Sequence, residues 1–227
     1  MQFRRYGIYY TPCPGALADF GAAWLGWDVT TGADVAHPDV DGLPLPVTEI
    51  TATPRKYGLH GTIKPPFFLA DGTQIDDLAQ TFATLCTRLA PITLDGLVLA
   101  RLGSFIALKI DGDQTALADL AGTVVRDLDN FRAPPTKAEL ERRRKSSLSA
   151  RQDALLTQWG YPYVMDEFRF HITLSGRVGK NAEATIAALT PHVTPILPNP
   201  FVVNSLTLVG EDDAGMFHEI QRHTLTG

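Results

Sequence analysis

Two short apolar stretches of the chain each carry a histidine and a threonine two residues apart. The first, YGLHGTIKPPF (57–67), contains His60 and Thr62, and the second, EFRFHITLSGR (167–177), contains His171 and Thr173. Side chains alternate between the two faces of a β-strand, so each histidine shares a face with its threonine. The neighbouring apolar residues point the other way. The pattern predicts two strands, each with one apolar face and one face able to do chemistry.

The residue types on these polar faces are suited to acid and base catalysis on a phosphate ester. Histidine changes its charge near neutral pH, so one imidazole can take a proton from water while the other protonates a leaving oxygen. The threonine hydroxyls can donate hydrogen bonds to phosphate oxygens. Lys64, Arg169 and Arg177 stand near the motifs and can offset the negative charge that builds up on phosphorus. This chemistry requires neither a metal ion nor a cofactor, and we expect none.

The surrounding sequence predicts the elements that hold these two strands. Apolar alternation indicates strands at 6–10, 58–64, within 92–110, and at 168–174, 201–209 and 216–223. Helical spacing indicates helices at 15–27, 73–90, 114–130, 136–158 and 181–190. We expect 28–56 to be mostly loop, and Pro65-Pro66 to end the first motif strand. The two halves of the chain have a similar order of elements, with one His-x-Thr strand in each.

This order of elements predicts an α+β fold with mostly antiparallel sheets and helices packed outside them. We expect a single bilobal domain over residues 1–227, with approximate halves 1–104 and 105–227. If the halves are related by a pseudo-two-fold axis, their two sheets place the His-x-Thr strands side by side. The polar faces of both strands then line one central cleft.

Composition narrows the classes of protein to be considered. The chain has 227 residues, a net charge of −5 and 44% hydrophobic residues, which is typical of a globular domain. No apolar run approaches the ~20 residues needed to cross a bilayer, and the N-terminal MQFRRYGIYYTP lacks the features of a signal peptide. Two cysteines, Cys13 and Cys86, suit a reducing cytoplasm, and no Cys/His cluster has metal-ligand spacing. The acidic balance disfavours a coat on long nucleic acid. We expect a cytoplasmic monomer that takes a small phosphorylated substrate.

The two motifs resemble the signature of the 2H phosphoesterase superfamily, a pair of His-x-Thr/Ser motifs in a bilobal fold. The chain is more closely similar to one branch, named for phosphonate metabolism and long described as a domain of unknown function. This likeness rests on RRYGIYYTP (4–12), PRKYGLHGTIKPPF (54–67) and EFRFHITLSGR (167–177). The resemblance implies that His60, Thr62, His171 and Thr173 are catalytic. It also implies a surrounding ring of substrate-binding residues: Tyr9, Arg55, Tyr57, Lys64, Arg169 and Arg177.

Each of these signals has a structural alternative. The histidines can be core residues bonded to their threonines, the arginines can form surface ion pairs, and Lys64 can be an exposed lysine at a strand end. A third His-x-Thr, at 192–194, is bracketed by Pro191 and Pro195, so we expect a loop there. The basic run at 137–151 is either a solvated helix face or a lid over a phosphorylated substrate.

These features favour a metal-independent phosphoric diester hydrolase that acts on a small cyclic or diester phosphate. The resemblance adds phosphonate metabolism as the setting. One alternative is an RNA-end enzyme acting on 2′,3′-cyclic or 2′,5′-linked termini, which needs an extended basic and aromatic groove. Another alternative is a protein that binds a phosphorylated metabolite without cleaving it. His60 and His171 are interchangeable as acid and base at this stage.

Overall fold

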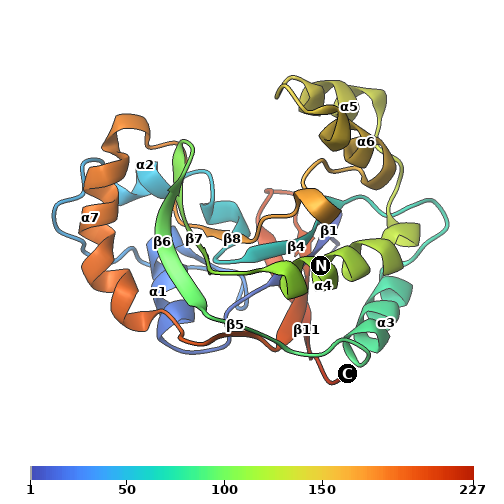
Figure 1. Ribbon diagram of the computed structural model, residues 1–227, viewed down its shortest axis with the longest axis horizontal. Helices are drawn as coiled ribbons and strands as arrows, with labels where there is room; N and C mark the ends of the chain where they lie inside the picture. The colour runs from blue at the N-terminus through green and yellow to red at the C-terminus, as the bar shows by residue number, and fades with distance from the viewer. Residues whose placement is uncertain (1) are drawn as a thin grey trace.

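A seven-stranded antiparallel sheet forms the centre of the protein, in a computed structural model that describes residues 2–227 (Figure 1). The strand order is β11-β10-β1-β4-β8-β7-β6. These strands are β1 (Arg5–Tyr10), β4 (Gly61–Phe67), β6 (Gly96–Leu102), β7 (Phe105–Asp111), β8 (His171–Thr173), β10 (Ser205–Glu211) and β11 (Phe217–Thr224). Two small antiparallel pairs join β2 (Trp27–Asp28) to β3 (Ala33–Asp34) and β5 (Ile92–Leu94) to β9 (Phe201–Val203).

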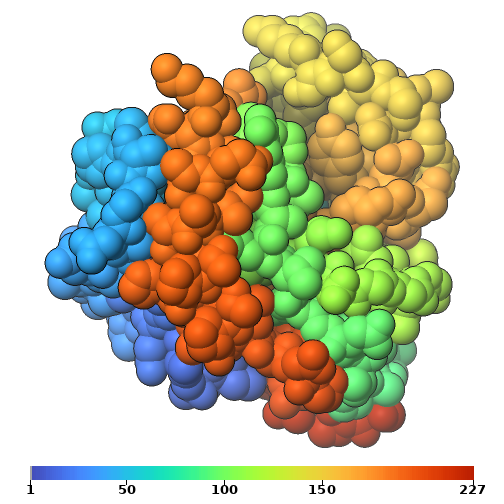
Figure 2. Space-filling view, turned by 60° about the vertical axis from the view of Figure 1, so that its left-hand side comes forward, coloured from blue at the N-terminus to red at the C-terminus, as the bar shows by residue number. Residues whose placement is uncertain are grey.

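Seven α-helices lie around this sheet within the described residues. They are α1 (Ala16–Leu25), α2 (Val47–Thr51), α3 (Ile75–Cys86), α4 (Thr115–Asp127), α5 (Lys137–Arg144), α6 (Ala150–Trp159) and α7 (Ala182–Val193). Short 3₁₀ turns occur at η1 (Arg55–Tyr57), η2 (Asp129–Phe131), η3 (Met165–Glu167), η4 (Gly179–Asn181) and η5 (Thr194–Ile196). Helix α7 packs on β6 and β7, α4 on β4, and α3 on β10 and β11, while α5 and α6 stand apart from the sheet (Figure 1). Figure 2 shows α7, in orange, lying against the green β6–β7 hairpin. No helix among residues 2–227 is both long and apolar enough to cross a membrane.

The two faces of the sheet have different roles, as shown by alternate residues of β1. Ile8 and Tyr10 point into the main core, which includes Phe82 of α3 and Leu120 of α4. Tyr9 points the other way and belongs to a smaller apolar cluster that includes Trp27, next to the β2–β3 pair. The helices therefore cover one face of the sheet, and the opposite face is left for the polar residues of the motif strands.

The two motif strands are direct neighbours at the centre of the sheet. Strands β4 and β8 pair antiparallel at a single position, Gly61 opposite Ile172. A β-carbon on residue 61 would lie 2.3 Å from the Phe170 ring, so only glycine permits this approach. The predicted juxtaposition of the two His-x-Thr strands is therefore present in the fold.

A β-bulge in β4 changes which residues face the helices. Tyr9 pairs with Thr62, and Ile8, the residue before Tyr9, pairs with Lys64. One step along β1 therefore corresponds to two steps along β4, so β4 has one extra residue at this point. The insertion turns Lys64 to the helix-covered face, where its side chain is 1% exposed. Alternation alone predicted Lys64 on the polar face with Thr62, and the bulge makes that prediction wrong.

The α+β fold class, with mainly antiparallel strands and helices outside, is confirmed. The two expected sheets are joined into one through β4 and β8. The boundary at 104/105 falls within the turn of the β6–β7 hairpin, and β10 pairs with β1, so the halves of the sequence are not the halves of the sheet. The expected division into halves differs from the observed sheet because strands far apart in the sequence pair with each other, and local sequence patterns do not report such pairing.

Several element boundaries also differ from the expectation. Strand β4 continues through Pro65 and Pro66, because β8 pairs only at Gly61 and the register with β1 shifts between Tyr6 and Ile8, so neither neighbouring strand pairs with the two prolines. The expected helix at 136–158 is two helices, since Ser149 caps α6 by accepting a hydrogen bond from the Gln152 backbone. Residues 192–194 end α7 instead of forming a loop.

Candidate active site

The four motif residues face one another across the β4–β8 pair. Extending the register from Gly61–Ile172 by one residue in each direction puts His60 opposite Thr173 and Thr62 opposite His171. Each histidine therefore lies across from the threonine of the other motif. All four side chains are half-buried, which is the exposure expected of groups that must meet both a scaffold and a ligand.

Two adjoining cavities open over these residues and share Thr62, Pro65 and Tyr161 in their walls. The larger, of about 800 Å³, is also lined by His60 and Thr173. The smaller, of about 290 Å³, is lined by His171 and Arg169. The tetrad His60, Thr62, His171 and Thr173 is thus brought together at one cavity system, as the two motifs predicted.

Backbone carbonyls determine the tautomers of both histidines. His60 Nδ1 lies 3.0 Å from the Gly58 carbonyl oxygen, and His171 Nδ1 lies 2.9 Å from the Arg169 carbonyl oxygen. A carbonyl oxygen can only accept a hydrogen bond, so both Nδ1 atoms carry the proton and donate it. Both Nε2 atoms are then available for chemistry, and His60 Nε2 lies 3.2 Å from the Thr62 hydroxyl.

The environment of His60 disfavours its charged form. Its imidazole stacks on the Tyr9 ring, with 4.0 Å between centroids, and lies 5.5 Å from the Tyr57 ring. Burial lowers the pKa of His60 to about 4, with a smaller lowering from the charge of His171, against the opposing effect of the Gly58 carbonyl. At neutral pH His60 is therefore an uncharged imidazole with an unprotonated Nε2, which is the form that a general base requires.

The expected outer ring is only partly assembled around this tetrad. Tyr9, Tyr57 and Arg177 line the larger cavity. Arg169 lines the smaller one, while its guanidinium donates to the Phe168 carbonyl at 2.6 Å. These four residues are close to the tetrad, in agreement with the resemblance.

Two members of the expected ring lie elsewhere. Lys64 Nζ donates to the Val125 carbonyl at 3.0 Å and pairs with Asp129 at 3.2 Å beneath the sheet. Arg55 donates to the Gly26 carbonyl and pairs with Asp34 at 2.6 Å. Both cations are engaged by groups outside the walls of the two cavities, so the structure does not bring them together with the tetrad.

Other cavity residues went unidentified in the sequence. Arg5, Arg143 and Tyr161 line the larger cavity, and the Arg143 guanidinium lies 4.7 Å from the centroid of the Tyr161 ring. Arg5 could have been found by alternation, because it shares a strand face with Tyr9. Arg143 could not, because several adjacent basic residues of α5 look equivalent in sequence and only the tertiary fold selects one.

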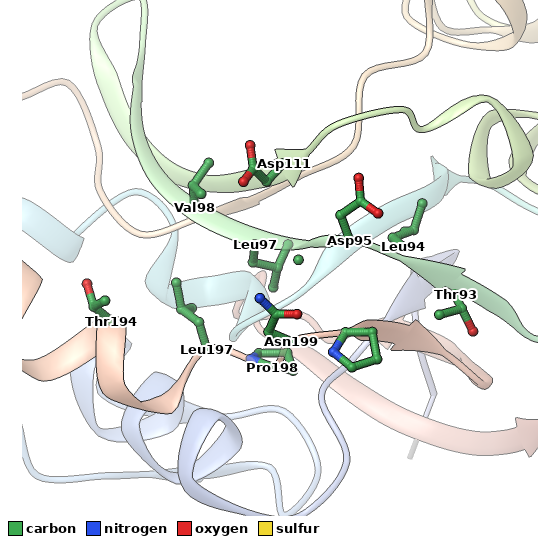
Figure 3. A pocket seen from close by; sticks show the side chains of 12 residues that line it. Thr93, Leu94, Asp95, Leu97, Val98, Asp111, Thr194, Leu197, Pro198 and Asn199 are labelled. Atoms are coloured by element: carbon green, nitrogen blue, oxygen red, sulfur yellow. The ribbon is translucent and has the colours of Figure 1, made fainter.

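A further cavity, of about 550 Å³, lies away from the histidines. Figure 3 shows the carboxylates of Asp95 and Asp111 and the amide of Asn199 among its walls. Among residues 2–227 no lysine or arginine lines it, so these residues supply no positive charge that would attract a phosphate. Within residues 2–227, no three His, Cys, Asp or Glu side chains are arranged to hold a metal ion.

The chain belongs to the family described as a protein of unknown function, DUF1045, whose model matches residues 62–218. It is also similar to two proteins called ribose 1,5-bisphosphate phosphokinase PhnN. The one from Janthinobacterium sp. (strain Marseille) is 34% identical over 98% of this chain and 51% of its own length. The one from Laribacter hongkongensis (strain HLHK9) is 34% identical over 93% of this chain and 49% of its own length. The chain spans about half the length of these relatives.

Solved structures with a related arrangement are more distant. The structure of E. coli LigT complexed with 3′-AMP is 15% identical over the whole of both chains, with a TM-score of 0.46. A structure described as a phosphoesterase is 15% identical over 99% of both chains, with a TM-score of 0.43. Likeness at this level carries no inference about the reaction, which has to come from the residues of the cavity.

Proposed function

We propose that this protein is a phosphoric diester hydrolase of the 2H phosphoesterase type, acting on a small cyclic or diester phosphate. The observation that carries this proposal is the pairing of β4 with β8, which sets the two His-x-Thr motifs face to face at two adjoining cavities. Two core histidines serving only stability would have no reason to present both Nε2 atoms on the open face of the sheet.

In the proposed reaction, His60 is the general base and His171 the general acid. Uncharged His60 takes a proton from water through Nε2, and the water oxygen forms a new bond to phosphorus. The bond from phosphorus to the leaving oxygen breaks, and His171 Nε2, protonated, delivers its proton to that oxygen. The product is a phosphomonoester with a free hydroxyl, and proton exchange with solvent restores both imidazoles.

The threonines and Arg177 assist by binding the phosphate. The hydroxyls of Thr62 and Thr173 lie on the motif face, and Thr173 can donate to a non-bridging oxygen. Thr62 can donate to the other once its hydroxyl turns from His60 Nε2 toward the phosphate. Arg177 lines the same cavity and has no ion-pair partner within residues 2–227, so its charge is free to offset that of the phosphate.

A ribose phosphate is the substrate class that we favour. The curated relatives that this chain matches over half their length carry the name of a kinase for ribose 1,5-bisphosphate. The kinase activity is a property named for those longer proteins and is not assigned to this chain. A cyclic phosphate of ribose would fit both the proposed chemistry and the setting in phosphonate metabolism that the sequence resemblance implies.

The proposal can be tested by phosphorus NMR of the purified protein with EDTA present. The panel contains ribose cyclic phosphates, nucleoside 2′,3′-cyclic phosphates and a short RNA with a 2′,3′-cyclic end. We expect conversion of a small cyclic phosphate to a monoester, lost in His60→Asn and in His171→Asn. His192→Asn is the matched control, because it alters the third His-x-Thr, on α7, and should keep full activity.

Each other outcome has a defined meaning. Turnover of the RNA end alone would replace the small-molecule assignment with an RNA-end enzyme. Turnover that is abolished by EDTA and restored by a divalent cation would contradict the metal-independent mechanism. If neither histidine substitution affected turnover, both imidazoles would have a structural role and not a catalytic one.

A further inference from the structure

The larger cavity extends from the tetrad to an end that is rich in cations and phenol groups. Arg5 of β1, Arg143 of α5 and the tyrosines Tyr57 and Tyr161 line this end, which we call the arginine end. Both guanidiniums line the same cavity. Burial lowers the pKa of Arg143, and the charge of Arg5 contributes to that lowering. The diester chemistry at the histidines does not use either arginine.

The charges at the arginine end are only partly neutralised. Arg5 donates to both carboxylate oxygens of Glu211, one of them at 2.7 Å. Arg143 is half-buried and forms no ion pair with any carboxylate of residues 2–227. A half-buried cation without a counterion is unfavourable in the empty protein, and an anionic ligand would remove that cost.

A second and independent feature of this end is the hydroxyl group of Tyr9. The Tyr9 side chain is 0% exposed and lines the same cavity, and its hydroxyl has no hydrogen-bond partner among the described residues. Burial raises the pKa of Tyr9, the charges of Tyr57 and Glu211 add to that rise, and Arg5 lowers it. Arg5 and Tyr9 lie on the same face of β1 and line the same cavity. A buried hydroxyl costs free energy unless something accepts its hydrogen bond.

We propose that the arginine end is a second anion subsite, which binds a phosphomonoester carried by the same substrate. This inference rests on the proposed function and specifies its substrate: a small sugar with a phosphodiester at the histidines and a separate terminal phosphate at Arg143, Arg5 and Tyr9. Arg143 supplies a positive charge that no carboxylate of residues 2–227 neutralises, and the N–H groups of Arg143 and Arg5 can donate to the several acceptor oxygens of a phosphomonoester. An adjacent phosphate of an RNA chain has related chemistry, but the cavity volume of about 800 Å³ and the net charge of −5 favour a small molecule.

The first test compares two substrates that differ only in the second phosphate. Adenosine 2′,3′-cyclic phosphate is compared with the same compound bearing a 5′-phosphate, and kcat/KM is measured for each. We expect the wild-type protein to prefer the phosphorylated compound by about tenfold to a hundredfold, the range for a charge-assisted hydrogen bond. Arg143→Gln should reduce that preference at least tenfold. Arg142→Gln, the same charge change at an exposed neighbour on α5, should leave it unchanged.

The second test measures binding and does not depend on turnover. Ribose 5-phosphate is titrated calorimetrically into the His60→Asn/His171→Asn protein, with and without Arg143→Gln or Arg142→Gln. We expect Arg143→Gln alone to weaken binding at least tenfold. If ribose 5-phosphate bound in an Arg143-dependent way but the wild-type protein turned over no cyclic phosphate, the diesterase assignment would be contradicted and the subsite would stand. The subsite proposal would be overturned if ribose 5-phosphate did not bind, or bound equally well to all these proteins. It would also be overturned if the wild-type protein turned over both cyclic phosphates equally well. A preference for an RNA that carries the same 2′,3′-cyclic end and extends from its 5′ side, over both nucleotides, would assign the arginine end to RNA.

Discussion

At the scale of single residues, the two histidines are held alike but are placed in different surroundings. Each donates Nδ1–H to a backbone carbonyl two residues earlier, which leaves Nε2 for the substrate. His60 alone is stacked on Tyr9 in the apolar corner near Trp27. The symmetry of the motifs thus supplies two similarly held imidazoles, and the proposed mechanism uses the asymmetry of their packing to assign His60 as the base and His171 as the acid.

The lowered pKa of His60 makes a prediction about stability and pH. The folded-state pKa of about 4 lies below the ordinary value of 6.5. Between pH 4 and pH 6.5, His60 is protonated in the unfolded chain but not in the folded protein. The stabilisation from uncharged His60 is therefore complete above pH 6.5 and is lost as the pH falls toward 4. The full shift corresponds to about 3 kcal/mol.

The measurement is the free energy of unfolding in urea from pH 4 to pH 7, for the wild-type protein and His60→Gln. We expect the wild type to gain up to about 3 kcal/mol relative to the variant over this range. Parallel curves for the two proteins would mean that His60 is not desolvated as the stacking on Tyr9 indicates.

Tyr9 offers a prediction in which stability and activity separate. Tyr9→Phe removes a buried hydroxyl that has no partner within residues 2–227, so the free energy of unfolding should stay the same or rise by about 1 kcal/mol. The same change should lower kcat/KM about tenfold for the cyclic phosphate that carries a 5′-phosphate. Urea unfolding and steady-state kinetics of this variant measure both quantities. A loss of stability greater than 1 kcal/mol would show that the hydroxyl has a stabilising partner.

At the scale of elements, the bulge in β4 decides which cation can reach the substrate. It turns Lys64 beneath the sheet, where Asp129 also binds Arg132 through hydrogen bonds of 2.8 Å and 3.0 Å. Burial lowers the pKa of Lys64 to about 8, against the opposing effect of Asp129. Lys64 is therefore part of the attachment of β4 to α4 and η2, and not part of the cavity.

This placement predicts that Lys64→Met leaves catalysis intact. We expect kcat/KM for a cyclic phosphate to change less than about threefold, since charge-assisted contacts to phosphate are worth more than that. Arg177→Met is the matched comparison, with the same loss of charge inside the cavity wall, and it should lower kcat/KM by about tenfold or more. If Lys64→Met and Arg177→Met lowered kcat/KM equally, Lys64 would have to contribute to substrate binding.

The same element shows how far the sequence could predict the site. Two His-x-Thr motifs in apolar strands were enough to predict the tetrad, because alternation holds over three residues. Alternation failed at Lys64, because a bulge depends on how β1 pairs with β4 and leaves no local pattern. Arg143 lines the cavity because of where the fold places α5, which the run of adjacent basic residues does not indicate.

At the scale of the whole molecule, the site depends on strands from distant parts of the sequence. β1 lies between β4 and β10, so the N-terminal strand joins the first motif to the last part of the chain. The local elements and the α+β class were predicted from periodicity. The single seven-stranded sheet was not predicted, because its strands pair across long distances in the sequence and periodicity reports only local structure.

The central claim is that His60 and His171 act as one catalytic unit across the β4–β8 pair, and a double-mutant cycle on kcat/KM tests it most directly. The wild type, His60→Asn, His171→Asn and the double variant are compared on the preferred cyclic phosphate in EDTA. Each single substitution should lower kcat/KM by about 10²–10⁴, the range for general acid or base catalysis. The double variant should lose little more than the worse single variant, because a step that needs both groups is already lost with one. Losses that multiply, or a single variant that keeps wild-type activity, would contradict the account.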